Sequence, residues 1–462
     1  MRRQQLVVLM IAGAARVAAA DTLELPALGA RATARSGAAM LAVDDGVALL
    51  LDPASLARRS TPRVTAGLAA VRQTATFTSD ASFPAGSAPP VDSRPPVLLR
   101  PWGGGAFGIG DRVVVGAAVF APTSAHHRYA SPAGDFDPTK DDRALFPQRY
   151  GGERLVLERW GAGAGAAVRV LPWLAVGAAA LVHRTELAHE LMIWAGPPET
   201  AGLQLGDLSP AFDMRFRASA SAWSPGASVG LVIAPLDVPV EIGLGATWSA
   251  PAQLSGEPRL TDSRGVTAGV REAVAGVDPD ATAELELPAP FTTRAGLRLL
   301  FGRLALELDG ELAFVSGAPA WELRGVSVTP SGQPTVELLR VPLGPALRER
   351  MAVRAAVDVE LVPGVVALLG GYAFTGRRVE DDSVTPVWPD ADSHTLSLGV
   401  EARVAAATVT LGVLHEFRPA RHPGDSRLRV IDPRGDLVVR AATGEGESAV
   451  TLVALDAEIA FE

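Results

Sequence analysis

The chain contains no cysteine, so disulfide bonds cannot stabilise its 462 residues. Aromatic residues make up only 5%, which is low for the packed core of a soluble β-sandwich. Lys140 is the only lysine and no basic block occurs, so the net charge of −9 argues against nucleic-acid binding. Beyond the N-terminus, no run approaches the ~20 apolar residues of a transmembrane helix. Stability must therefore come from apolar burial or from a closed ladder of backbone hydrogen bonds.

The N-terminus predicts export. Arg2 and Arg3 precede the apolar run 6–15, and the small residues 18–20 form a cleavage site before Asp21. We therefore expect residues 1–20 to be a secretory signal peptide. An exported chain without a helical span belongs in the periplasm, in the medium or in an outer-membrane barrel.

The C-terminal stretch 451–462 has a period of two. Val453, Leu455 and Ile459 share one face, whereas Asp456 and Glu458 fall on the other. Such a strand needs an apolar environment on one side only. Lipid around a closed barrel supplies it, and so does one sheet of a soluble sandwich.

Connections of alternating length favour the barrel. Short turns near 110, 172, 236–239, 302, 363 and 406 alternate with long polar connections at about 79–96, 122–152, 193–211, 250–281, 316–347, 376–393 and 418–447. The expected strands are 63–78, 97–109, 112–121, 153–171, 173–192, 212–234, 240–250, 281–301, 304–316, 348–362, 365–376, 394–405, 408–418 and 448–462. Pro225-Gly226 interrupts the sixth of them. The sequence thus predicts an all-β fold, a 14-stranded antiparallel transmembrane β-barrel over residues 63–462, with both ends on the short-turn side.

Charged residues on the inward faces predict a polar, hydrated interior, because a soluble core could not bury them cheaply. A barrel of this size is too wide for side chains alone to fill, so we expect a channel or a plug. Residues 21–62 show no strand alternation, and their apolar run 47–51 needs cover. This segment is therefore the candidate plug.

The stretch 28–57, LGARATARSGAAMLAVDDGVALLLDPASLA, resembles the N-terminal hatch of the FadL-type outer-membrane transporters, which carry long-chain fatty acids or aromatic hydrocarbons. The matching hatch residues are Asp44, Asp45, Asp52, Pro53, Ala54 and Leu56. Position 52 is Asp where the family usually has Asn. Stretches 113–129, 169–191 and 389–404 also look familial, so the similarity covers nearly the whole mature chain.

The resemblance implies a 14-stranded barrel plugged by its N-terminal hatch, here residues 21–62. It also implies passive uptake of long-chain fatty acids or other hydrophobic small molecules. Ligands would bind in a groove among the long loops, pass to a pocket beside the hatch and leave sideways near the third strand. We expect no cofactor, no metal and no enzymatic activity. The expected partners of this monomer are outer-membrane lipid, lipopolysaccharide and the barrel assembly machinery.

Several of these residues have a structural interpretation as well. Asp52-Pro53 can start a turn and cap a helix, and it can also hold the hatch against the third strand. Gly116 and Pro122 mark a lateral opening, or Pro122 merely ends its strand. Trp194, Leu203 and Leu205 belong to a ligand groove or to loop packing.

The adjacent pair His126-His127 lacks the further ligands of a metal site, and we interpret it as a polar pair on a surface loop. The alternative function is a polar-solute porin, adhesin or receptor barrel without lipid transport. The hatch argues against a simple porin. A hydrolase would need a nucleophile and a base, and no Gly-x-Ser-x-Gly elbow occurs.

Overall fold

The computed structural model describes residues 25–80, 86–131, 145–194, 213–262, 283–315, 345–422 and 443–461, with the short pieces 82–83, 208–210, 322–323, 326–328, 336–338, 341–342, 429–431 and 437–440 between them. The expected signal peptide lies outside these residues. The main sheet contains 17 strands, of which β4 is a short piece beside β1, whereas β10 with β11 and β12 with β13 each form one barrel strand. The sheet closes because β1 pairs with both β5 and β25. The predicted 14-stranded antiparallel barrel is confirmed.

Most barrel strands match the predicted ranges, but the seventh was predicted to end at residue 250 and continues as β11 to Asp262, within the predicted connection 250–281. They are β1 (Arg63–Ser79), β5 (Leu98–Ile109), β6 (Val113–Arg128), β7 (Arg154–Leu171), β8 (Leu174–Trp194), β9 (Asp213–Ile233), β10 (Val240–Ser249), β11 (Ala252–Asp262), β12 (Ala283–Leu287), β13 (Phe291–Phe301), β14 (Leu304–Phe314), β19 (Arg350–Val362), β20 (Val366–Thr375), β21 (Ser393–Val404), β22 (Ala407–Arg421) and β25 (Gly444–Ala460). Short pieces in the long connections are β2 (Ser82–Phe83), β3 (Gly86–Ser87), β4 (Val91–Asp92), β15 (Glu322–Leu323), β16 (Val326–Val328), β17 (Val336–Leu338), β18 (Val341–Pro342), β23 (Arg429–Ile431) and β24 (Leu437–Arg440).

The outer face of the barrel is apolar. In β25, Val453, Leu455 and Ile459 are exposed, whereas Ala454 and Asp456 on the opposite face are buried. Other barrel strands repeat this alternation with exposed leucine, valine and aromatic side chains. No helix in the described part of the chain is long and apolar enough to cross a membrane.

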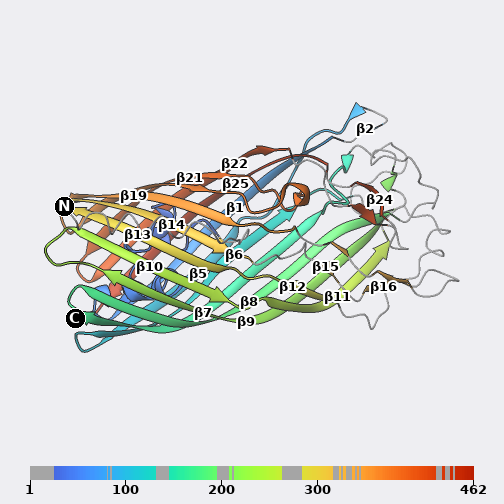
Figure 1. The fold of residues 1–462 in the computed structure, drawn as a ribbon. Coiled ribbons are helices and arrows are strands. Elements are labelled where there is room, and N and C mark those ends of the chain that lie inside the picture. Colours follow the sequence, from blue (N-terminus) through green and yellow to red (C-terminus); the bar gives the residue numbers. More distant parts are fainter. Residues whose placement is uncertain are drawn as a thin grey trace, which may run out of the picture.

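The short turns gather at one end of the barrel (Figure 1). Gly110, Gly302 and Gly364 adopt positive φ values of 64°, 60° and 70° there, a conformation that side-chain-bearing residues rarely take. These turns fix consecutive strands as antiparallel neighbours. The long connections all start from the opposite end.

The wall is broken in the seventh barrel strand, at the point where it faces two prolines of the eighth. Pairing stops between Ser249 and Ala252 of one strand, opposite Pro288 and Pro290 of the next, because proline donates no backbone hydrogen bond. The expected interruption of the sixth strand at Pro225 was wrong, since β9 is continuous. The Pro225 carbonyl points toward the break, where it accepts a hydrogen bond from the backbone N–H of residue 250. The missing N–H would point the same way, at residue 250, so the proline removes one ladder bond where pairing with the seventh strand stops.

The interior has two parts of different polarity. Toward the short turns, buried carboxylates and arginines line β14 and β19, as predicted. Toward the long connections Leu155, Leu187 and Phe216 form an apolar cluster with Val387 and Trp388, beside buried polar groups such as Arg149 and Asp213. The expectation of a polar interior therefore holds only in part for this half. The connection between β20 and β21 contains helix η5 (Asp381–Ser383). It contributes apolar side chains to this cluster.

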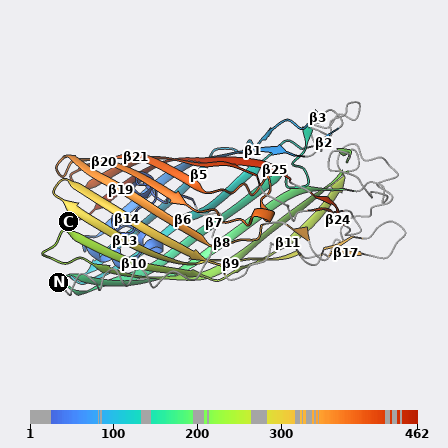
Figure 2. The ribbon, with the colours of Figure 1, turned by 45° about the horizontal axis from the view of Figure 1, so that its top comes forward.

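Residues 25–62, here called the N-terminal segment, lie inside the half with the short turns (Figures 1 and 2). Their short helices are α2 (Ala30–Thr33), α3 (Ala48–Leu51) and η1 (Pro53–Arg58). Helix α2 packs against β21, β22 and β25, and η1 packs against β7, β8 and β9. Most residues of the segment are buried.

Candidate functional site

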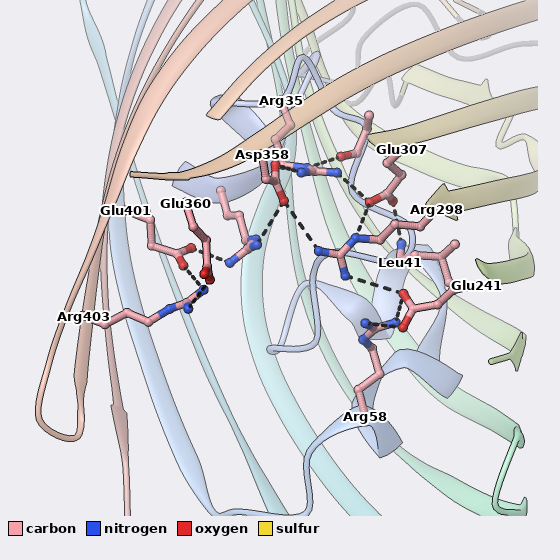
Figure 3. A network of polar contacts seen from close by, with 12 residues as sticks. Arg35, Leu41, Arg58, Glu241, Arg298, Glu307, Asp358, Glu360, Glu401 and Arg403 are labelled. Atoms are coloured by element: carbon pink, nitrogen blue, oxygen red, sulfur yellow. Dashed lines mark hydrogen bonds and ion pairs between the residues drawn. The ribbon is translucent and has the colours of Figure 1, made fainter. Parts of the chain in front are cut away.

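One buried arginine ties the N-terminal segment to the barrel wall. The Arg35 side chain is 0% exposed and pairs with Glu307 at 2.6 Å and with Asp358 (Figure 3). Its Nε donates to the carbonyl of Ala38 at 2.7 Å, and the backbone N–H of Leu41 donates to the other Glu307 oxygen at 2.8 Å. Because the charges are paired and hydrogen-bonded, burial of the guanidinium is tolerated.

A second carboxylate binds the turn after α2. The backbone N–H groups of Ala39 and Met40 donate to Asp309 at 2.9 and 3.1 Å. Carboxylate-to-amide hydrogen bonds of this kind are stronger than neutral ones. The inward acidic residues of β14 therefore bind the backbone of the segment as well as its arginines.

A third carboxylate reaches α2 across three strands. Asp456 of β25 accepts hydrogen bonds from the Trp102 indole of β5 at 2.8 Å and from the backbone N–H of Ala30. Gly67 of β1 lies between them in register. A Cβ at position 67 would lie 2.0 Å from the carboxylate and 2.2 Å from the indole nitrogen, so only glycine fits.

Two arginines at the end of η1 hold the segment near the short turns. Arg58 forms a bidentate pair with Glu241 at 2.6 and 2.8 Å. Arg59 binds Asp44 at 2.7 Å through two nitrogens and Glu458 of β25 at 2.8 Å. Burial alone would raise the pKa of Asp44, but the Arg59 guanidinium holds it below its ordinary value. A polar space of about 450 Å³ lies beside these residues.

Two other acidic residues of the segment lack such a cation partner. Burial raises the pKa of Asp45 to about 7, and the nearby Asp44 carboxylate adds to the rise. Burial also raises the pKa of Asp52 to about 7, although its Oδ1 accepts a hydrogen bond from the backbone N–H of Ala54 at 3.0 Å. Asp52 therefore caps η1, as one of its two sequence interpretations requires.

The Asp52-Pro53-Ala54 turn sits on the fifth and sixth barrel strands, not on the third. Gly177 of β8 and Gly230 of β9 pair with each other beneath it. A Cβ at Gly230 would lie 1.7 Å from the Asp52 carboxylate, and one at Gly177 would lie 2.4 Å from Pro53 and Ala54 backbone atoms. Two facing glycines thus form the seat of this turn.

Leu56 is the residue of the matched hatch set that lies against the third strand. A Cβ at Gly116 of β6 would lie 3.2 Å from a Leu56 methyl group. Gly116 is paired on both sides, with Ala106 and Gly165, so it lies in intact wall. Its small size makes room for Leu56.

Pro122 lies at a break between the second and third barrel strands. β5 and β6 pair only as far as Gly103 and Val119, and residues 98–102 of β5 pair with β1 alone. β6 does not end at residue 121, as expected, but continues to residue 128 after a register shift between Phe120 and Thr123. We call this region, 98–102 and 120–124, the β5–β6 break.

At the break, groups outside the two strands form hydrogen bonds with the backbone of β6 that β5 leaves unpaired. The N–H of Leu25, in the N-terminal segment, donates to the Pro122 carbonyl at 2.7 Å. The Gln73 side chain of β1 bonds to the Ser124 carbonyl at 2.6 Å and to the His126 N–H at 2.7 Å. The break is therefore lined by hydrogen bonds that do not belong to the strand ladder.

Arg100 of β5 crosses the break. It is 5% exposed, and its guanidinium donates to Ser124 at 2.7 Å and to Glu158 of β7 at 2.8 Å. His126 also bonds to Glu158 at 2.8 Å, and the guanidinium lies 5.7 Å from the Trp160 ring centre. The expectation that His126 and His127 form a surface loop pair was wrong, since both lie on β6 and His127 is buried.

A cavity of about 100 Å³ lies between the N-terminal segment and the wall. Leu25, Met40 and Leu51 line it from the segment, and Pro122 and His183 line it from the barrel. The cavity therefore borders both the segment and the β5–β6 break.

Three solved structures share this architecture. A Pseudomonas aeruginosa FadL homologue aligns with 95% of this chain and 100% of its own, at 16% identity and a TM-score of 0.71. The P. putida toluene transporter TodX aligns over 95% and 100% of the two chains, at 14% identity and 0.68. The Ralstonia pickettii toluene transporter TbuX aligns over 95% and 99%, at 14% identity and 0.63.

The fold is that of the FadL-type barrels. No family model matches the sequence, and no curated protein matches it. The FadL-type fold extends over nearly the whole chain, because the aligned share of this chain is 95%.

The expected loop groove is only partly described. Trp194 ends β8 and is buried, at 4% exposed. Leu203 and Leu205 lie outside the described residues. Sequence reasoning missed Arg35, Arg100 and His183, because an isolated arginine or histidine carries no motif; only the inward acidic pattern of 304–314 indicated that cations must face it.

Proposed function

We propose that this chain is a passive importer of hydrophobic molecules in the bacterial outer membrane. The observation that carries the proposal is the β5–β6 break, where pairing stops at Val119 and the N-terminal segment covers the interrupted strand. An apolar molecule gains nothing from a path lined by charges, whereas a lateral exit leads directly to lipid. The N-terminal segment is the proposed hatch.

The comparisons support this assignment by their names. Two of the similar structures are toluene transporters, and another is a monoaromatic hydrocarbon channel. The apolar outer face fits lipid and lipopolysaccharide, and a barrel of this kind would be inserted by the barrel assembly machinery. We propose hydrophobic compounds as the cargo, with long-chain fatty acids as one class, and no enzymatic activity.

The occupied lumen argues against the alternative of a polar-solute porin. Water-filled porins need a continuous polar channel. Here Arg35 and the backbone of residues 39–41 bind inward carboxylates, so the charges that would line a pore hold the segment instead. No geometry of the described residues favours an adhesin or receptor over transport.

A reversible cross-link tests the lateral route. The backbone hydrogen bond between Leu25 and Pro122 brings these residues to about the separation of paired strands, within reach of a disulfide. Leu25→Cys with Pro122→Cys, in this otherwise cysteine-free chain, should lock the segment over the break on oxidation. Uptake of radiolabelled oleate or toluene by cells without another importer should stop and should return on reduction.

The matched control joins Thr78→Cys and Glu445→Cys, which are register partners on β1 and β25, far along the wall from the break. Oxidation of this pair should leave uptake unchanged. Full uptake by a verified Leu25–Pro122 disulfide would refute the lateral route. Loss of uptake in both oxidised proteins would show that the effect is not specific to the break.

A further inference from the structure

The Arg100 side chain starts from the inner face of the barrel wall. Arg100 is 5% exposed, whereas its neighbours Leu99 and Pro101 on β5 are exposed on the outside. Its register partner on β1 is Ala69, which belongs to a buried apolar cluster. Register partners in an antiparallel sheet share a face, so the Cβ of Arg100 points inward.

The groups that Arg100 binds lie on the outer face of the wall. Ser124 of β6 and Glu158 of β7 are register partners. The next pair along these strands, Ala125 and Leu157, belongs to the buried apolar cluster of the interior, so Ser124 and Glu158 point the other way. The Arg100 guanidinium donates to them at 2.7 and 2.8 Å. Its side chain therefore passes from the inner to the outer face through the β5–β6 break.

Several contacts on the outer face hold this side chain in place. His126 also bonds to Glu158 at 2.8 Å, and the Trp160 ring centre lies 5.7 Å from the guanidinium carbon of Arg100. The Trp160 indole donates to the second Glu158 oxygen at 3.3 Å. Hydrogen bonds between charged groups are stronger than neutral ones, and the aromatic ring adds a further attraction. Separating the pair would leave a charge that is poorly hydrated, which is costly.

The β5–β6 break is therefore closed twice. The inner closure is the hydrogen bond from the Leu25 N–H to the Pro122 carbonyl, at 2.7 Å. The outer closure is the Arg100–Glu158 ion pair, which joins β5 to β7 across β6. The inner closure belongs to the N-terminal segment and moves with it, whereas the outer closure belongs to the wall alone. Movement of the segment would thus leave the outer closure shut.

We propose that the Arg100–Glu158 ion pair is a second gate of the lateral opening, which a molecule crossing to lipid displaces after the N-terminal segment has moved. The proposal rests on the proposed function, because it adds a gating pair to the same lateral route. Release into lipid then takes two separate events, one in the segment and one in the wall.

Thiol labelling from the lipid side tests the gate without any cargo. Ala121→Cys places the only thiol of the chain inside the break, where residue 121 is 1% exposed. The barrel in lipid nanodiscs would react with a lipid-soluble maleimide. The rate would be divided by that of Val119→Cys, a position that is 58% exposed on the outer face. Arg100→Met should raise this ratio about tenfold to a hundredfold, the effect of hydrogen bonds between charged groups.

Two further variants separate the outer closure from the inner one. Glu158→Gln should also raise the ratio, and Arg100→Met combined with Glu158→Gln should react no faster than Arg100→Met, because both remove the same pair. Leu25→Pro lacks the backbone N–H of the inner closure. It should leave the ratio close to that of the barrel with Ala121→Cys alone, because the outer closure remains.

Arg154→Met is the matched control. Arg154 and Glu190 form another outward Arg–Glu pair, at 3.0 Å on β7 and β8, where the two strands are paired without interruption. Loss of this pair should leave the labelling ratio unchanged. Heat-modifiable gel migration checks that each variant is folded, and Glu158→Gln, which keeps the shape of the side chain, carries the test if Arg100→Met does not fold.

Three results would overturn the gate: an unchanged ratio in both Arg100→Met and Glu158→Gln, an equal rise in Arg154→Met, or full labelling in Leu25→Pro alone. Uptake of radiolabelled oleate or toluene by the unmodified chain tests the proposed function separately. A raised ratio in Arg100→Met without any uptake by the unmodified chain would support the gate and count against import only.

Discussion

Replacing Asp52 by Asn should make the binding of the N-terminal segment inside the barrel, here called its seating, less dependent on pH. Asp52 is 0% exposed and lies on Gly230, with no cation in contact. Burial raises its pKa from 3.8 to about 7. A difference of this size corresponds to about 4 kcal/mol between the seated and the hydrated carboxylate, at about 1.4 kcal/mol for each tenfold change.

The sign follows from proton binding. Between pH 3.8 and about 7 the seated segment holds a proton on Asp52 that a released, hydrated segment would lose. Seating is therefore strongest at low pH and weakens as pH rises through this window. Above pH 7 both states are ionised and the effect is constant. Asn carries no proton to lose, so Asp52→Asn should be better seated at pH 8.

Thiol labelling measures the effect, because the chain has no cysteine of its own. Ala57→Cys places one thiol in η1, where residue 57 is buried. Its labelling rate, divided by that of the exposed control Thr61→Cys, reports how often the segment leaves its seat. From pH 5 to pH 8 this ratio should rise at least about tenfold, and at most about a hundredfold for Asp52 alone, because only the part of the window between pH 5 and about 7 is crossed.

Asp45 contributes in the same direction, because burial raises its pKa to about 7 as well. Asp52→Asn should therefore remove the larger part of the pH dependence, and Asp45→Asn added to it should remove the rest. Asp45 is partly exposed, so its share is smaller. An unchanged pH dependence in the double variant would refute the reasoning, and so would a labelling ratio that falls as pH rises.

Three further predictions concern the contacts of the segment. Arg35→Met removes the buried cation from two carboxylates, which then keep only longer ion pairs with Arg31 and Arg298, and should cost up to about 3–5 kcal/mol of seating, seen as raised ion conductance in planar bilayers. Gly67→Ala should detach α2, because its Cβ would lie 2.0 Å from a carboxylate oxygen; the buried tryptophan that shares this carboxylate should then change its fluorescence. Gly116→Trp should displace Leu56 and raise conductance, whereas Ala117→Trp, on the outward face, should not. Unchanged conductance in Arg35→Met and Gly116→Trp would mean that these contacts do not hold the segment.

The sequence predicted the wall of the barrel well, because each strand carries its own apolar alternation. The sequence-based predictions failed where the structure of a residue depends on the strand beside it. Pro225 looks like an interruption, but β9 continues past it because its other edge stays paired with β8. Pro122 looks like a strand end, but β6 needs only one partner, β7, to continue past it.

The site was less accessible to sequence reasoning. The acidic alternation of 304–314 was visible, yet whether water or Arg35 faces it depends on packing between residues about 270 positions apart. Gly116 and Pro122 were expected to mark one opening, and the structure separates intact wall at the first from broken pairing at the second. The contact of Asp52 with two glycines of β8 and β9 could not be predicted from the sequence, because a single glycine in a strand does not indicate which distant residue packs on it.

The β5–β6 break also affects the mechanics of the molecule. A closed ring of hydrogen-bonded strands resists widening equally around its circumference. Here one junction consists of the short run of pairs from Gly103–Val119 to Ile109–Val113, and glycine recurs along its β5 side. Radial strain should therefore concentrate at this seam, and the barrel should flex there more than at the junctions that are paired along their whole length.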